Sequence, residues 1–136
     1  MFNDKYYQNT SINISLGPNV KIIGNHSFCD YYGYGTLTIP STVKAINHYS
    51  FYDVRNLKIN FENYDTLEYI GNYTFGRSNV STFILGTNLK YYGIKIFYDV
   101  NNLNLIFKSK HLTFNPNGYE HLITGENTLE TNNTTY

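Results

Sequence analysis

Short stretches in which every second residue is apolar recur along most of the chain. They cover residues 12–16, 37–39, 57–61, 83–85 and 103–107. A period of two residues predicts short β-strands that bury one face. The first four stretches end in turn-forming sequence at 17–19, 40–42, 62–66 and 86–88, and the third turn is two residues longer than the others. The pattern therefore predicts a series of similar short strands, each followed by a similar turn, with an insertion in the third turn.

The same spacing links several columns of residues between these strands. The phenylalanines Phe28, Phe51, Phe75 and Phe97 follow one another at steps of 23, 24 and 22 residues. Four further columns keep these steps: Val20, Val43, Leu67 and Leu89; Ile23, Ile46, Ile70 and Tyr92; Gly24, Asn47, Gly71 and Gly93; and Ser27, Ser50, Thr74 and Ile96. Because Gly and Asn accept positive φ most readily, the glycine column predicts a tight turn with positive φ.

A fixed period of this length predicts a mainly β repeat solenoid of four to five units over residues 12–107. Each unit is expected to contain a strand, a turn, a second short extended piece, and a brief helical or 3₁₀ turn that carries the phenylalanine. One unit buries too little apolar surface to fold alone, so neighbouring units must share a core. We expect an N-terminal cap or irregular segment at 1–11, a capping segment at 108–124, and a disordered tail at 125–136.

One unit carries a family resemblance. Residues 37–57, LTIPSTVKAINHYSFYDVRNL, resemble the repeat of BspA-like leucine-rich repeat proteins. The matching positions are Leu37, Ile39, Pro40, Val43, Ile46, Phe51, Val54 and Leu57. Other units depart from it, since Gly17 and Gly86 stand where proline is usual and Tyr92 replaces isoleucine. The resemblance implies a right-handed leucine-rich-repeat stack that binds other macromolecules, often as an adhesive surface protein of bacteria and protists, and it implies no catalytic residues.

Composition narrows the set of partners. Of 136 residues, 10 are Lys or Arg and 10 are Asp or Glu, so a net charge of zero argues against nucleic acid as a partner. The single cysteine excludes an internal disulfide and a cysteine zinc site. No signal peptide and no apolar run of membrane-spanning length is present, which predicts no membrane span and a cytoplasmic location by default. The resemblance also allows a location at the cell surface.

Candidate chemistry is sparse. The histidines at 26, 48, 111 and 121 share no column and form no metal-binding motif, so we predict no metal site and no cofactor. Cys29 lies three residues from His26, which leaves a Cys-dependent hydrolase as a remote alternative. A small half-buried thiol explains Cys29 more simply, and we predict no catalytic residue.

The predicted functional surface is the solvent side of the stacked strands, where alternation places mostly small, neutral side chains. These are Asn13, Ser15, Thr36, Thr38, Lys58, Asn60, Thr82, Ile84, Asn104 and Ile106. A second candidate is a tyrosine-rich rim formed by Tyr31, Tyr32, Tyr34, Tyr52 and Tyr98. The function predicted is a non-catalytic module for interaction or adhesion that binds another protein. The alternative is a structural unit that self-associates through the ends of the solenoid.

Overall fold

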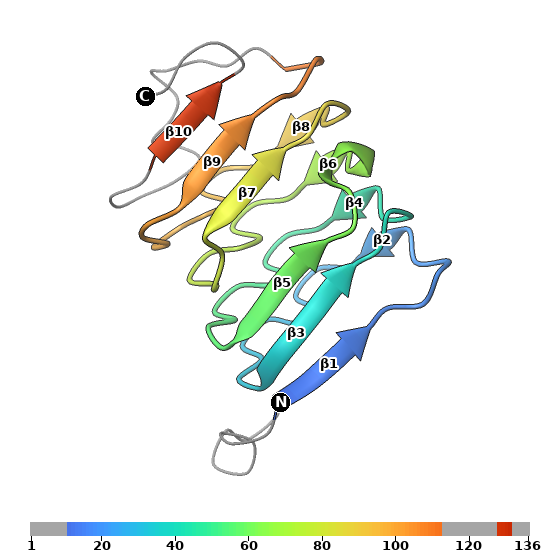
Figure 1. Cartoon of the computed structure of the whole chain (residues 1–136), viewed down its shortest axis with the longest axis vertical. Helices are drawn as coiled ribbons and strands as arrows, with labels where there is room; N and C mark the ends of the chain where they lie inside the picture. Colours follow the sequence, from blue (N-terminus) through green and yellow to red (C-terminus); the bar gives the residue numbers. More distant parts are fainter. Residues whose placement is uncertain (1–10, 113–127, 132–136) are drawn as a thin grey trace.

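The computed structural model describes residues 11–112 and 128–131, and nearly all of its regular structure is parallel β-strand. The longer strands are β1 (Ser11–Ser15), β3 (Tyr34–Ile39), β5 (Leu57–Phe61), β7 (Thr82–Leu85) and β9 (Asn104–Phe107). The shorter strands are β2 (Ile22–Ile23), β4 (Ala45–Ile46), β6 (Tyr69–Ile70) and β8 (Tyr91–Tyr92). Figure 1 shows the longer strands on one side of a coiled chain and the shorter strands on the other. The predicted β solenoid with a leucine-rich-repeat-like stack is confirmed.

Hydrogen-bonded sheets connect each coil to the next. The shorter strands form one four-stranded sheet in the order β2-β4-β6-β8. The longer strands instead form two separate sheets: β1-β3-β5, and β10-β9-β7, in which β10 (Thr128–Thr131) is added beside β9. The predicted insertion at residues 62–66 carries the 3₁₀ helix η1 (Tyr64–Thr66), at the place where the longer-strand sheet is interrupted.

The phenylalanine column forms the centre of the core. The rings of Phe28 and Phe51 stack with centroids 5.2 Å apart, those of Phe51 and Phe75 at 5.5 Å, and those of Phe75 and Phe97 at 6.0 Å. Phe51, Phe75 and Phe97 are fully buried, whereas Phe28 in the first coil is half-buried. Offset stacking of this kind adds to the free energy gained by burying the rings. The columns read from the sequence therefore correspond to layers of the core.

Backbone hydrogen bonds run from coil to coil beside these rings. The amide of Phe28 donates to the carbonyl of Ser50 at 2.8 Å, and the amide of Phe51 donates to Thr74 at 2.9 Å. The amide of Phe75 continues the series to Ile96 at 2.8 Å. Because a buried amide without a partner is costly, this series fixes the stacking distance of the coils.

Side chains extend the series in a neighbouring column. The amide of His48 donates to Asn25 Oδ1 at 3.1 Å, and the amide of Asn72 donates to His48 Nδ1 at 2.8 Å. The amide of Ile94 then donates to Asn72 Oδ1 at 3.0 Å. His48 therefore acts as an acceptor between coils, which explains why it occupies the position that holds asparagine in the units before and after it.

The prediction of positive φ in the glycine column is wrong. Gly35 is the described glycine with positive φ, and the other positive-φ positions belong to side-chain-bearing residues on both sides of each phenylalanine. Those positions are His26, Asp30, Tyr49, Asp53, Tyr73, Arg77, Lys95 and Asp99, with Asn102 in addition. On both sides of Phe28, Phe51 and Phe75, the amides of the positive-φ residues donate to carbonyls of the next coil. These hydrogen bonds hold the residues in a conformation that costs about 1–2 kcal/mol each in isolation.

At Gly71 and Gly93 of this column, glycine is needed for close approach between coils. A Cβ atom on Gly71 would lie 2.6 Å from the amide nitrogen of His48, and one on Gly93 would lie 2.6 Å from the amide nitrogen of Asn72. On Gly24, in the first coil, the nearest atom would be Ser27 Oγ at 3.5 Å, an ordinary contact. The requirement for glycine therefore comes from the preceding coil.

The chain ends differ in part from the sequence prediction. Residues 1–10 and 113–124 of the two predicted caps lie outside the described residues. The range 125–136 was predicted to be disordered, but Thr128–Thr131 forms β10 and pairs in parallel with β9. A polar composition does not prevent this pairing, because the edge of β9 offers backbone donors and acceptors to an extended segment.

Replacing Gly71 with alanine should destabilise the fold, whereas Gly24→Ala should leave the stability unchanged or raise it slightly. Overpacking against a neighbouring backbone typically costs about 1–3 kcal/mol. The free energy of unfolding, measured by urea titration, checks the pair. Equal effects of the two substitutions would contradict the close-approach explanation, because both glycines occupy the same column.

Candidate functional site

The ten predicted sheet-face positions lie in rows across the longer strands. In the first sheet, Asn13 pairs with Thr36 and Thr36 with Lys58, while Ser15, Thr38 and Asn60 form the parallel row. In the second sheet, Thr82 pairs with Asn104, and Ile84 pairs with Ile106. All ten side chains are exposed or half-buried, whereas the intervening Leu37, Phe83 and Leu105 are fully buried. The alternation therefore places these ten residues on the outer face, as the sequence predicted.

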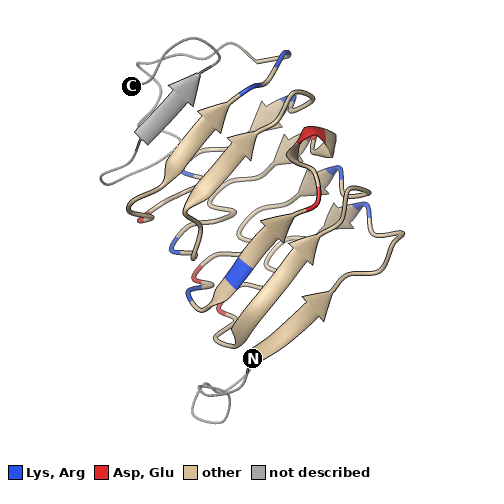
Figure 2. Ribbon diagram, viewed as in Figure 1, with Lys and Arg blue, Asp and Glu red and all other residues tan. Residues whose placement is uncertain are grey.

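This outer face is nearly uncharged. Lys58 is the one charged residue in strands β1, β3, β5, β7 and β9. Figure 2 shows most other charged residues in the connections between strands. Small hydroxyl and amide side chains in register form a flat surface. A partner can make hydrogen bonds to this surface without removing many charged side chains from water.

A groove divides the face between β5 and β7. It has a volume of about 270 Å³ and is lined on one side by Lys58, Ile59, Asn60 and Phe61, and on the other by Asn79, Val80, Ser81 and Thr82. Tyr64 from η1 closes one end, and its hydroxyl lies 3.4 Å from the carbonyl oxygen of Thr82. Burial raises the pKa of Tyr64, so the phenol keeps the proton with which it donates this hydrogen bond. The sequence showed the insertion but not the groove, which depends on how the longer coil packs.

The two predicted tyrosines, Tyr52 and Tyr98, do not lie on the strand face. Tyr52 contacts Tyr49 at a ring distance of 5.3 Å and Tyr73 at 6.3 Å, and Tyr73 lies 5.6 Å from Tyr98. Sequence reasoning missed Tyr49 and Tyr73 as members of this cluster, although both occupy one column with His26, whose ring stacks on Tyr49 at 5.2 Å. Burial raises the pKa of Tyr52, which keeps its phenol neutral.

Charged residues border this tyrosine cluster. The guanidinium of Arg77 lies 3.2 Å from Asp99 and 5.8 Å from the ring centre of Tyr98. On the coil before it, Arg55 pairs with Asp53, two residues away on the same coil. These ion pairs are largely exposed, and such pairs contribute little to stability. Lys95 Nζ also lies 5.9 Å from the ring centre of Tyr98, so charges of both signs surround the cluster.

A separate apolar surface lies on the sheet of shorter strands. Ile22 is 62% exposed, Tyr91 is 46% exposed, and Ile94 beyond β8 is 51% exposed. The signal was present in the sequence, because a two-residue strand such as Ile22–Ile23 or Tyr91–Tyr92 must turn one of its two side chains outward.

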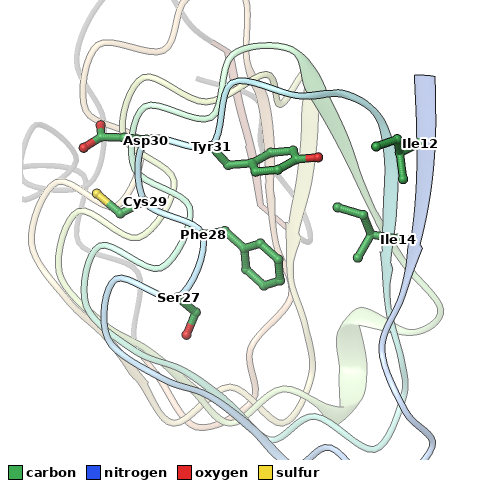
Figure 3. Close-up of a pocket in the computed structure, with 7 residues that line it drawn as sticks. All are labelled: Ile12, Ile14, Ser27, Phe28, Cys29, Asp30 and Tyr31. Carbon is green, nitrogen blue, oxygen red and sulfur yellow. The ribbon is translucent and has the colours of Figure 1, made fainter. Parts of the chain in front are cut away.

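Cys29 lacks the surroundings of an activated nucleophile. Figure 3 shows its side chain pointing away from the rings of Phe28 and Tyr31. Burial raises the pKa of the thiol, and the carboxylate of Asp30 raises it further, so the thiolate is disfavoured. His26, the proposed partner, places its ring against Tyr49.

The described residues contain no group of three or more His, Cys, Asp or Glu side chains that could hold a metal ion. Within that same part of the chain, no helix has the length and apolar character needed to cross a membrane.

Comparison with known proteins identifies a repeat family. The family model for the BspA type leucine rich repeat region matches residues 1–123 in six copies. This range extends beyond residues 12–107, which the sequence columns assigned to the repeat. No curated protein matches the chain, and no solved structure matches it.

Alkylation of Cys29 by iodoacetamide should be slower at pH 8 than alkylation of free cysteine, because the raised pKa lowers the thiolate fraction. The rate should rise as the pH passes through that raised pKa. Asp30→Asn should accelerate the reaction, since asparagine tolerates the positive φ of this position and removes the negative charge. A rate above that of free cysteine would contradict this and revive the nucleophile assignment.

Proposed function

The chain belongs to the BspA-type leucine-rich repeat family, and on this premise we propose that it is a binding module whose outer strand face engages another protein. Repeat proteins of this class are often used for protein interaction. The observation that carries the proposal is the in-register, nearly uncharged surface of the longer strands. Its rows present polar side chains at regular intervals, and an extended flat face of this kind is what solenoids use to contact large partners.

The chemistry of the face defines what it binds. Thr36 Oγ1 donates to Asn13 Oδ1 at 2.8 Å, so side chains of neighbouring strands within one row are already oriented before a partner arrives. The row of Ser15, Thr38 and Asn60 in the first sheet is polar. The equivalent row in the second sheet is apolar, because it consists of Ile84 and Ile106. A partner with a polar surface beside an apolar one matches this gradient. No step of bond chemistry is required of the chain.

A glutamate introduced on this face should weaken partner binding. In the native source, a partner captured by the wild-type chain should bind Thr38→Glu and Thr82→Glu at least about tenfold more weakly, because each places an unpaired charge in the interface. Ile22→Glu is the matched control, because it replaces an exposed neutral side chain with glutamate on the sheet of shorter strands instead. Dissociation constants from biolayer interferometry check the series. Loss of binding in the control alone would overturn the assignment of the strand face.

Self-association is a second candidate, favoured by the N-terminal end of the described solenoid. A cavity of about 410 Å³ opens there, lined by Ile12, Ile14, Phe28 and Tyr31 together with Ser27, Cys29 and Asp30. Ile12 is 38% exposed, and Phe28 is less buried than the other phenylalanines of its column. A second copy of the chain stacked on this end would cover the apolar surface.

If the chain assembles through this end, its average mass should rise with concentration. Ile12→Lys should abolish the rise, because the substitution places a charge on the apolar surface without touching the strand face. Light scattering over a range of concentrations measures both proteins. A wild-type chain that remains a strict monomer would exclude the self-association candidate and leave the first proposal intact.

A further inference from the structure

The groove between β5 and β7 lies where one strand of a parallel sheet would be expected. Every other pair of successive longer strands in the described solenoid is joined by a ladder, β1 to β3, β3 to β5 and β7 to β9. Between β5 and β7 no strand pairing occurs, and a cavity of about 270 Å³ takes its place. The interruption is confined to this side, because β4, β6 and β8 pair without a break on the other.

Backbone polar groups from both strands point into the groove. At the end of the β3–β5 ladder the amide of Glu62 donates to Ile39, and backbone groups alternate sides along a strand. The amide and carbonyl groups of Leu57 and Ile59 therefore face away from β3, toward β7.

The opposite wall follows from the same alternation. The amide of Asn104 donates to the carbonyl of Ser81, and that of Lys108 donates to Leu85. These bonds turn the intervening Thr82 and Ile84 backbone groups away from β9, toward β5. Of these residues, Ile59 and Thr82 line the groove, and Asn79, Val80 and Ser81 from the connection before β7 complete its second wall.

Both ends of the groove are held by contacts between coils. Before it, the amide of Asn79 donates to the carbonyl of Val54 at 3.0 Å. After it, the amide of Thr87 donates to Asp65 Oδ1 at 2.9 Å. Tyr64 packs at this second end, with its ring 4.5 Å from that of Phe61 and 5.1 Å from that of Phe83. The opening is therefore a preformed feature of the fold.

We propose that this groove binds a short extended polypeptide segment of a partner protein, which pairs in parallel with β5 and β7 and completes the interrupted sheet. The inference rests on the proposed protein-binding function and names the chemistry of one part of that surface. Strand addition of this kind obtains affinity from main-chain hydrogen bonds and specificity from alternate side chains. Here two edges are available to one segment, so its amides and carbonyls on both sides find partners.

The lining defines the sequence that fits. Ile59, Phe61 and Val80 form an apolar floor, so inward-facing residues of the segment should be small and apolar. Outward-facing residues lie beside Lys58, the one charge of the five longer strands in the described solenoid. Charge complementarity therefore favours aspartate or glutamate at alternate positions.

The test uses the full chain and fluorescein-labelled hexapeptides in which aspartate alternates with alanine, valine or threonine. Fluorescence anisotropy should show saturable binding of at least one peptide. The same peptide with N-methylated amides should bind at least about tenfold more weakly, because it loses its main-chain donors. Lys58→Glu should weaken binding about tenfold. The matched control Lys44→Glu, an exposed lysine beside the shorter strands, should not.

Hydrogen exchange tests both walls. With peptide bound, the amides of Ile59 on β5 and Thr82 on β7 should exchange several-fold more slowly, while the amide of Asn104, already donated to Ser81, should be unchanged. Equal binding of the N-methylated peptide, absence of this protection, or no binding by any peptide overturns the inference. A captured partner that is lost with Thr38→Glu but unaffected by Lys58→Glu also overturns the groove and retains the strand face, so the two failures are distinguishable.

Discussion

Hydrogen bonding of each coil to the next is the constraint on which the rest of the structure depends. Three sets of hydrogen bonds join successive coils at the same spacing. They are the bonds from the amides of the phenylalanine column, those to the side chains of Asn25, His48 and Asn72, and those of the parallel ladders. This spacing determines which side chains fit. It brings the backbone of one coil against Gly71 and Gly93 of later coils, and it holds Tyr49, Tyr73 and their equivalents at positive φ. The stacked rings fill the volume that remains.

Side-chain burial could be predicted from the sequence because it follows the period of the chain directly. Phe51, Phe75 and Phe97 are core residues, and Thr38 and Lys58 lie on the outer face, as their spacing indicated. Backbone conformation could not be predicted in the same way. Positive φ falls on Tyr49, Asp53 and Tyr73 because their amides donate hydrogen bonds to the adjacent coil, and these bonds outweigh local preference. The glycine column was recognised for its composition, but its cause lies in a neighbouring coil that local sequence does not show.

The candidate site likewise has a part that could be predicted from the sequence and a part that could not. Alternation along single strands was sufficient to place all ten outer-face residues, and the register then put them in rows. The groove needed three-dimensional information, because its lining residues come from two coils, with Tyr64 packed against Phe61 and Phe83. Likewise Tyr52 and Tyr98 are near Tyr49 and Tyr73 through the stacking of loops, although sequence proximity had suggested Tyr31, Tyr32 and Tyr34 as neighbours. Proximity between coils depends on the repeat spacing rather than on distance along the chain.

The two extra residues in the turn at 62–66 have a local effect on the stack. On the side of the longer strands the pairing is lost between β5 and β7, yet Leu67 and Ile70 return to their columns and β6 pairs with β4 in the regular register. Each coil contacts its nearest neighbours alone, so the interruption ends within one layer and β7 pairs normally with β9. A stack of this kind can therefore vary in coil length at a single layer while the coils on either side keep their order.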